Sequence, residues 1–141
     1  MPTGSVFTQM MRGDLPARFV WNDDLVVALL SNTPLNAGHT LVVPRREVDH
    51  WIDLEPDLLH HLMEVSRDIA QAMHVAFRPV KVGMVIAGIE VRHVHIHLVP
   101  IDAVRDLNFE HQELQPDPAR LDADADRIRN ALRGRGPEDR W

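Results

Sequence analysis

Three histidines alternate with apolar residues in the segment His93-Val-His-Ile-His-Leu-Val-Pro100. Side chains of a β-strand point to alternate faces, so His93, His95 and His97 are expected on one face, about 6.6–7 Å apart. Imidazole titrates near neutral pH and can act as nucleophile, acid, base or metal ligand. Chance rarely supplies three imidazoles in register within an apolar strand, so the motif indicates a site that performs chemistry.

The elements that position this motif follow from the apolar pattern. Runs of β-branched, aromatic and aliphatic residues predict five strands, at residues 18–22, 25–30, 39–43, 80–87 and 92–99. Apolar residues at helical spacing predict a long helix over residues 56–77, and shorter helices are expected over 6–12 and 118–132. Strands on both sides of one central helix, with short connections, predict an α+β fold with an antiparallel sheet of about five strands.

Composition and charge exclude several classes of protein. The chain has 141 residues, of which 45% are hydrophobic and 26% charged, as expected for one globular domain. It has no cysteine, which excludes disulfides, thiolate metal sites and cysteine nucleophiles. A net charge of −6 argues against a nucleic-acid partner. There is no signal-peptide pattern and no apolar run long enough for a membrane span, so we expect a cytoplasmic protein without a membrane partner.

The motif and its surroundings resemble the histidine-triad (HIT) family of nucleotide hydrolases and transferases, in its bacterial HIT-like branch. The family signature alternates histidines and apolar residues, and residues 93–99 match it at every position. The segments Trp21-Asn-Asp-Asp24 and Asn36-Ala-Gly-His-Thr-Leu-Val-Val-Pro-Arg45 are also similar to family segments. The resemblance covers residues 5–102, and we predict that residues 1–102 form the HIT domain. Residues 103–141 would be a helical extension, part of the same domain or of a dimer interface.

The resemblance assigns roles to four histidines. His95 matches the nucleophile that attacks the α-phosphate of a nucleotide, and His97 matches the residue that contacts the phosphate oxygens. His93 and His39 match the remaining members of the catalytic cluster. A neutral imidazole can attack at pH 7, and a nucleotidyl-histidine intermediate divides one displacement into two easier steps. Flanking imidazoles can stabilise developing phosphate charge.

The resemblance also implies a nucleotide-binding pocket near the N-terminus. Its apolar base contacts would be Phe7, Met10, Leu15 and Leu30, with Trp21 nearby, although ordinary core packing would explain each of them equally well. Ser31 stands where many family members place an aspartate that binds the ribose hydroxyls. We expect Ser31 and the adjacent Asn32 to contact the nucleotide, without the stronger bond that a carboxylate would make.

The connection before the motif departs from the family pattern. Glutamine and serine or threonine donors common in the family are replaced by Ile89 and Glu90. A regular strand would point Glu90 away from the face that carries His93, unless a turn at Gly88 brings it back. In that case its carboxylate would repel an anionic leaving group and tolerate an amine. Nucleoside phosphoramidates would then be cleaved in preference to dinucleoside polyphosphates.

Two other functions fit the same residues. Three imidazoles can also assemble a zinc site, although only Glu90 is an obvious partner for a ligand's second ring nitrogen. The missing donors also fit a nucleotide-binding regulatory module with little turnover. The resemblance implies that no metal or cofactor is required, although adventitious zinc could bind the histidines, and that the chain forms a homodimer. Five other histidines are expected to be solvated surface residues: His50, His60, His61, His74 and His111. Arg45 and Arg46 could attract a phosphate or simply form an exposed pair.

Overall fold

One antiparallel sheet organises the protein in the computed structural model, which describes residues 3–133. Its strand order is β1-β2-β3-β5-β4. The strands are β1 (Phe19–Asn22), β2 (Val26–Leu30), β3 (Thr40–Pro44), β4 (Lys81–Ile86) and β5 (Ile96–Ile101). The helices are α1 (Val6–Met11), α2 (Pro56–Phe77) and α3 (Pro118–Leu132), with three short 3-10 turns at η1 (Trp51–Asp53), η2 (Val104–Leu107) and η3 (Phe109–His111). The predicted α+β fold is confirmed.

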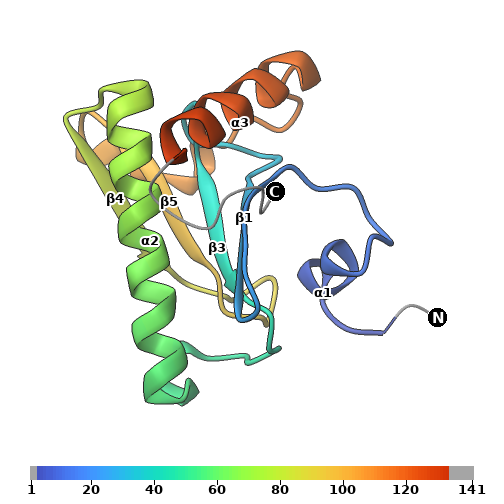
Figure 1. Ribbon diagram of the computed structural model, residues 1–141. Coiled ribbons are helices and arrows are strands. Elements are labelled where there is room, and N and C mark those ends of the chain that lie inside the picture. Colours follow the sequence, from blue (N-terminus) through green and yellow to red (C-terminus); the bar gives the residue numbers. More distant parts are fainter. Residues whose placement is uncertain (1–2, 134–141) are drawn as a thin grey trace.

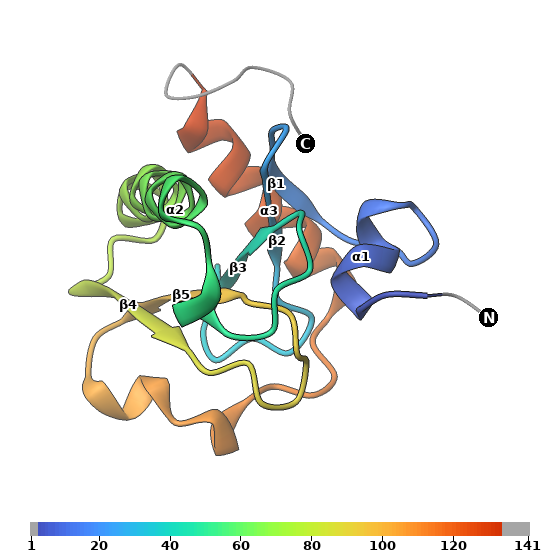
Figure 2. The same ribbon diagram turned by 90° about the horizontal axis from the view of Figure 1, so that it is seen from below.

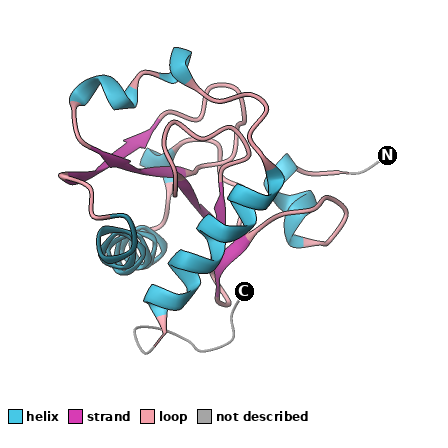
Figure 3. Ribbon diagram, turned by 90° about the horizontal axis from the view of Figure 1, so that it is seen from above, coloured by secondary structure: helices cyan, strands magenta, loops and turns pink. Residues whose placement is uncertain are grey.

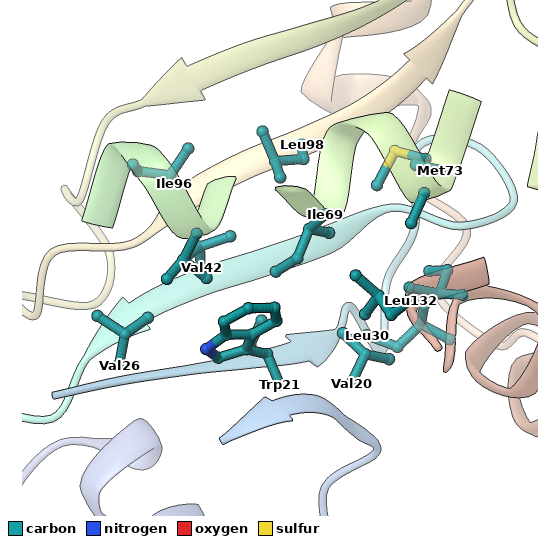
Figure 4. Close-up of a cluster of buried hydrophobic side chains, with 14 of the residues drawn as sticks. Val20, Trp21, Val26, Leu30, Val42, Ile69, Met73, Ile96, Leu98 and Leu132 are labelled. Atoms are coloured by element: carbon teal, nitrogen blue, oxygen red, sulfur yellow. The ribbon is translucent and has the colours of Figure 1, made fainter. Parts of the chain in front are cut away.

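The face of the sheet under α2 holds the main apolar core (Figure 4). The helix begins with Pro56 in its first turn, where a missing N–H is tolerated, and ends at Phe77. The next residue, Arg78, caps it with a left-handed φ of 51°. Its buried stripe includes Leu62, Ile69 and Met73, which lie at the spacing the sequence predicted. Each such buried side chain contributes about 1.5–3 kcal/mol of transfer free energy, so this face accounts for much of the stability.

The last helix shares this core. The side chains of α3 that the sequence placed on one face, Leu121, Ala125, Ile128 and Leu132, are all buried. They pack beside α2 and against β1, and Figure 3 shows α3 lying across the sheet next to α2, which is seen end-on. The boundary at residue 102 stays a prediction. Within residues 3–133, no helix has both the length and the apolar composition needed to cross a membrane.

The opposite face of the sheet carries α1, the loop over residues 87–95, and the segment with η2 and η3. Figure 2 shows α2 on one side of the sheet and η2 and η3 on the other, and α1 stands apart from α2 in Figure 1. Side chains of Val27, Leu29, Leu41 and Val43 form a smaller apolar cluster here with Phe7. This face therefore combines a few apolar contacts with chain segments that are not strands.

The last strand begins later than the sequence predicted. It starts at Ile96, so His97 is the one motif histidine in β5, and His93 and His95 belong to the preceding loop. The pairing between β3 and β5 ends at Val42 and Ile96. Pro44 at the end of β3 has no N–H to continue this ladder. The predicted start of this strand at residue 92 is therefore wrong, although Val94, Ile96 and Leu98 still lie in the core under α2, as the alternation predicts.

Candidate active site

The structure brings together the four histidines that the sequence singled out, on the face opposite α2. The ring centroids of His95 and His97 lie 4.9 Å apart, and those of His39 and His97 lie 5.2 Å apart. His93 joins the cluster through its backbone, because Nδ1 of His95 lies 2.7 Å from the His93 carbonyl oxygen. The cluster thus combines His39 from immediately before β3, His97 from β5, and two histidines from the loop before β5.

Burial controls the charge of this cluster. His39 and His93 have no exposed surface, and His95 is only 7% exposed. Desolvation, followed by the charges of its histidine neighbours, lowers the pKa of His39 to about 3. Desolvation likewise lowers the pKa of His97 to about 4 and lowers those of His93 and His95. All four imidazoles are therefore neutral at pH 7, with one N–H and one lone pair each.

The hydrogen bonds of His39 determine which nitrogen of His97 carries its proton. The backbone N–H of Leu35 donates to Nδ1 of His39 over 2.9 Å, so the hydrogen of His39 is on Nε2. That nitrogen lies 2.9 Å from Nδ1 of His97 and donates to it. Neutral His97 must then carry its hydrogen on Nε2. It presents an N–H donor, as a residue that contacts phosphate oxygens should.

His95 has the opposite arrangement. Its Nδ1 faces the His93 carbonyl oxygen, which can only accept, so Nδ1 carries the hydrogen. Its Nε2 keeps the lone pair and has no hydrogen-bond partner among the residues the structure describes. A nucleophile needs this combination of a free lone pair and a held ring.

A cavity of about 300 Å³ lies over His95 and His97. One wall is the loop that follows β4, and the other is formed by the 3-10 segment after β5. Its remaining lining residues are Ala87, Gly88, Ile89, Glu90, Val91, Phe109 and Gln112. Glu90 reaches the cavity because its loop has left the strand ladder, so the alternation rule does not apply to it.

The segment after β5 supplies a wall that sequence reasoning missed. The Phe109 ring meets the His97 ring edge-on at a centroid distance of 4.9 Å. The Gln112 side-chain amide donates to the backbone oxygen and the hydroxyl of Thr33, over 3.2 and 3.1 Å. This stretch has no apolar period and no motif, so no sequence signal pointed to it.

The comparisons with known proteins agree with this geometry. The HIT domain pattern matches residues 12–104. The chain belongs to the HIT domain family. It is 33% identical over 100 residues to an uncharacterised HIT-like protein of Methanocaldococcus jannaschii, covering 67% of this chain and 77% of that protein.

Two further relatives extend the similarity beyond the HIT domain. An adenylylsulfatase of Arabidopsis thaliana is 24% identical over 133 residues, covering 91% of this chain and 67% of that protein. The crystal structure of a zinc-bound histidine triad family protein from Mycobacterium smegmatis superposes with a TM-score of 0.77 at 27% identity, covering 91% of this chain and 92% of that one.

Among the predicted nucleotide contacts of this HIT protein, those on α1 lie beside the histidines. The Phe7 ring centroid is 5.0 Å from that of His95 and 5.7 Å from that of His93. Met10 packs against the same apolar cluster as Phe7. Leu15 follows α1 and is half-buried. Phe7 and Met10 thus occupy the side of the cluster where an apolar base could lie.

Leu30 and Trp21 are not brought to the histidines. Both lie in the core on the α2 side of the sheet, as Figure 4 shows. Side chains alternate along β2, so Leu29 rather than Leu30 lies on the face of the imidazoles. Ser31 is buried and its hydroxyl accepts from the Thr33 N–H over 3.2 Å, whereas Asn32 is exposed.

The remaining histidines and basic residues divide into exposed and structural groups. His50, His60, His74 and His111 are exposed, as predicted. The prediction for His61 is wrong, because the half-buried ring lies 2.7 Å from the Asp23 carboxylate, which also accepts from Trp21 Nε1. Arg45 donates to the Asp23 carbonyl oxygen and to Asn22, which leaves only Arg46 exposed.

No metal centre is evident in the part of the chain that the structure describes. Residues 3–133 contain no group of three or more His, Cys, Asp or Glu side chains placed to hold a metal ion. Both ring nitrogens of His39 and of His93 are engaged in hydrogen bonds within the protein. Zinc ligation by these two residues would require those bonds to break.

Proposed function

We propose that this HIT protein is a nucleotide hydrolase or transferase that acts at the α-phosphate through a nucleotidyl-His95 intermediate. The observation that carries the proposal is the held ring of His95, whose Nε2 lone pair is free beside the cavity. Attack by Nε2 forms a nitrogen–phosphorus bond while the bond to the leaving group breaks. Water, or an acceptor in a transfer reaction, then displaces the nucleotide and restores the neutral imidazole.

His97 would stabilise the charge that develops on the phosphate. Its Nε2–H is fixed by the chain of bonds from Leu35 through His39, so the donor is already oriented before substrate binds. Phe7 and Met10 would hold the base, with Leu29 on the same face of the sheet. Further contacts with the nucleotide are still predicted for Leu15, Ser31 and Asn32.

The lining of the cavity favours one kind of leaving group. It contains the carboxylate of Glu90, apolar side chains such as Ile89 and Phe109, and no lysine or arginine. A polyphosphate would lack a cationic partner there and would meet a like charge. We therefore infer that nucleoside phosphoramidates, which release an amine, are cleaved in preference to dinucleoside polyphosphates.

The direct test incubates the protein with adenosine phosphoramidate and with diadenosine polyphosphates in parallel. Release of adenosine monophosphate measures turnover, and mass spectrometry of rapidly quenched protein locates the nucleotidyl adduct. An adduct on His95 supports the mechanism. An adduct on His93 or His97, or turnover without any adduct at His95, would assign the reaction to another residue.

A nucleotide-binding module with little turnover is the second candidate function. The observation in its favour is that residues 87–91 bring no glutamine, serine or threonine side chain to the cavity. Tight binding of a nucleoside monophosphate together with negligible turnover of both substrate classes would favour this function. The zinc-bound relative from Mycobacterium smegmatis also makes metal analysis informative. Activity retained after chelation would exclude a zinc enzyme.

We also propose that two copies of the chain form a homodimer through α2 and β4. A groove of about 430 Å³ runs between these elements, and Met63, Met84 and Val82 line it. β4 is an edge strand of the described sheet, and a second copy would pair its free side. A monomeric mass in sedimentation at micromolar concentration would contradict this assembly.

A further inference from the structure

The N-terminal segment reaches the imidazole cluster through one serine. Ser5 lies immediately before α1, and its hydroxyl oxygen is 2.6 Å from Nδ1 of His93, which lies 88 positions away in sequence. His93 has no exposed surface. Its ring therefore cannot touch a bound nucleotide, and any contribution it makes must act through its neighbours.

The partners of His93 determine the direction of the bond to Ser5. Nε2 of His93 lies 2.7 Å from the carbonyl oxygen of Pro44, which can only accept a hydrogen bond. The hydrogen of the ring is therefore on Nε2. Burial lowers the pKa of His93, so the ring is neutral at pH 7 and Nδ1 has a lone pair. Ser5 must donate its hydroxyl hydrogen to that lone pair.

Ser5 is itself held by two elements. Its hydroxyl oxygen accepts from the Thr8 backbone N–H of α1 over 3.2 Å, which caps the helix. Its backbone N–H donates to the Glu47 carboxylate, which follows β3. The Thr8 hydroxyl donates to the same carboxylate oxygen over 2.9 Å. The Ser5 hydroxyl hydrogen has two acceptors within reach, Nδ1 of His93 at 2.6 Å and the Thr8 hydroxyl oxygen at 3.4 Å. The much shorter distance assigns this hydrogen to His93.

We propose that Ser5 is a positioning residue, whose hydroxyl holds His93 in the tautomer that binds Pro44 and so fixes the carbonyl that aligns His95. The inference rests on the proposed function, because it concerns how the nucleophile is oriented. Without the hydroxyl, the other tautomer becomes accessible. Its Nδ1–H would turn toward Glu47, now 3.9 Å away, and a lone pair on Nε2 would face the Pro44 oxygen.

Repulsion between that lone pair and the Pro44 oxygen would move the segment that contains His93. The same segment supplies the carbonyl oxygen that accepts from Nδ1 of His95. A shift of this oxygen would rotate the His95 ring or release it from the tautomer with a free Nε2. The reaction would slow, while base contacts on α1 would remain.

Two substitutions at one position separate the hydroxyl bond from helix capping. Glycine is nearly as good an N-cap as serine, so Ser5→Gly removes the hydroxyl and keeps most of the cap, whereas Ser5→Thr keeps both. Thr8→Val is the matched control, because it breaks the bond to Glu47 and leaves Ser5 beside His93. With adenosine phosphoramidate, we expect kcat to fall about tenfold or more in Ser5→Gly, with KM changed less than about threefold. Ser5→Thr and Thr8→Val should stay within about threefold of the wild type in both constants.

Imidazole nitrogen NMR on the same proteins gives a readout that does not depend on activity. In the wild type and in Ser5→Thr, His93 should show a protonated Nε2 and an unprotonated Nδ1. Ser5→Gly should lose that pattern. An unchanged pattern in Ser5→Gly overturns the proposal, and so does a changed pattern with wild-type kcat. If the wild type cleaves no nucleotide substrate, the proposed function fails, and the NMR comparison still shows whether Ser5 controls the tautomer.

Discussion

Burial has different effects on the two faces of the sheet. Under α2, burial removes apolar side chains such as Ile69 and Leu98 from water, which stabilises the fold. On the other face, burial removes three imidazoles from water completely or nearly so and His97 in part, which costs stability whenever they would be charged. The second face therefore holds neutral histidines at pH 7, and neutral histidine is the nucleophilic form. The same physical effect therefore stabilises the fold on one side and keeps the imidazoles neutral on the other.

The strongest test of this comparison removes the nucleophile. His95→Ala is expected to reduce turnover of adenosine phosphoramidate by about three orders of magnitude or more, because no other imidazole of the cluster presents a free Nε2 lone pair. The fold should survive, since the main core lies on the other face. Binding of adenosine monophosphate, measured by calorimetry, should persist. A variant with near wild-type turnover would contradict the role of His95.

A second test uses the pH dependence of stability. The pKa of His97 is lowered to about 4 in the folded protein, below the unfolded value of 6.5. The unfolded state therefore binds more protons, and stability should decline as pH falls from about 6.5 to 4, by about 3 kcal/mol for this residue. Urea unfolding across that range measures the decline. His97→Asn should show a shallower slope than the wild type, and equal slopes would mean that His97 does not titrate with folding.

The face under α2 was the more predictable of the two. The helical period of α2 and the apolar strands identify its core because each signal is local. The start of β5 depends instead on Pro44 of another strand, and histidines alternating with apolar residues look like a strand even where no partner exists. Leu29 and Leu30 are both apolar, so their pattern does not reveal which faces the site. The contact between Phe109 and His97 depends on the path of the chain after β5, which no local sequence pattern indicates.

The third test concerns the Glu90 carboxylate, which lines the cavity. Glu90→Gln should narrow the preference for phosphoramidates over dinucleoside polyphosphates by several-fold, mainly by raising the polyphosphate rate, because a repulsive charge is removed. Glu110→Gln is the control, since Glu110 is an exposed carboxylate on η3 that does not line the cavity. The ratio of the two kcat/KM values is the measurement. An unchanged ratio in Glu90→Gln would show that Glu90 does not influence the leaving group.

The smallest effect is expected at Asp124, a buried acid on the α2 side of the sheet. Asp124 of α3 is 5% exposed, and its Oδ2 atom is the buried side-chain oxygen without a partner in the described chain. Burial raises the pKa of Asp124, and the nearby charges of Arg127 and Arg120 only partly oppose it. The folded state therefore holds the proton more tightly than the unfolded state, so stability is lost as pH rises through the folded pKa.

Asp124→Asn removes the cost of burying a charged carboxylate, with almost no change in the shape of the side chain. We expect a gain of about 1 kcal/mol in the free energy of unfolding at pH 7, because a neutral amide is desolvated more cheaply than a carboxylate. The gain should vanish near pH 3, where the unfolded aspartate is also protonated. Asp126→Asn is the control, since its carboxylate is exposed beside Arg129 and such pairs contribute little. A loss of stability in Asp124→Asn at pH 7 would mean that the charge of Asp124 stabilises the folded protein. In that case the α2 face would be stabilised by a buried charge as well as by apolar packing.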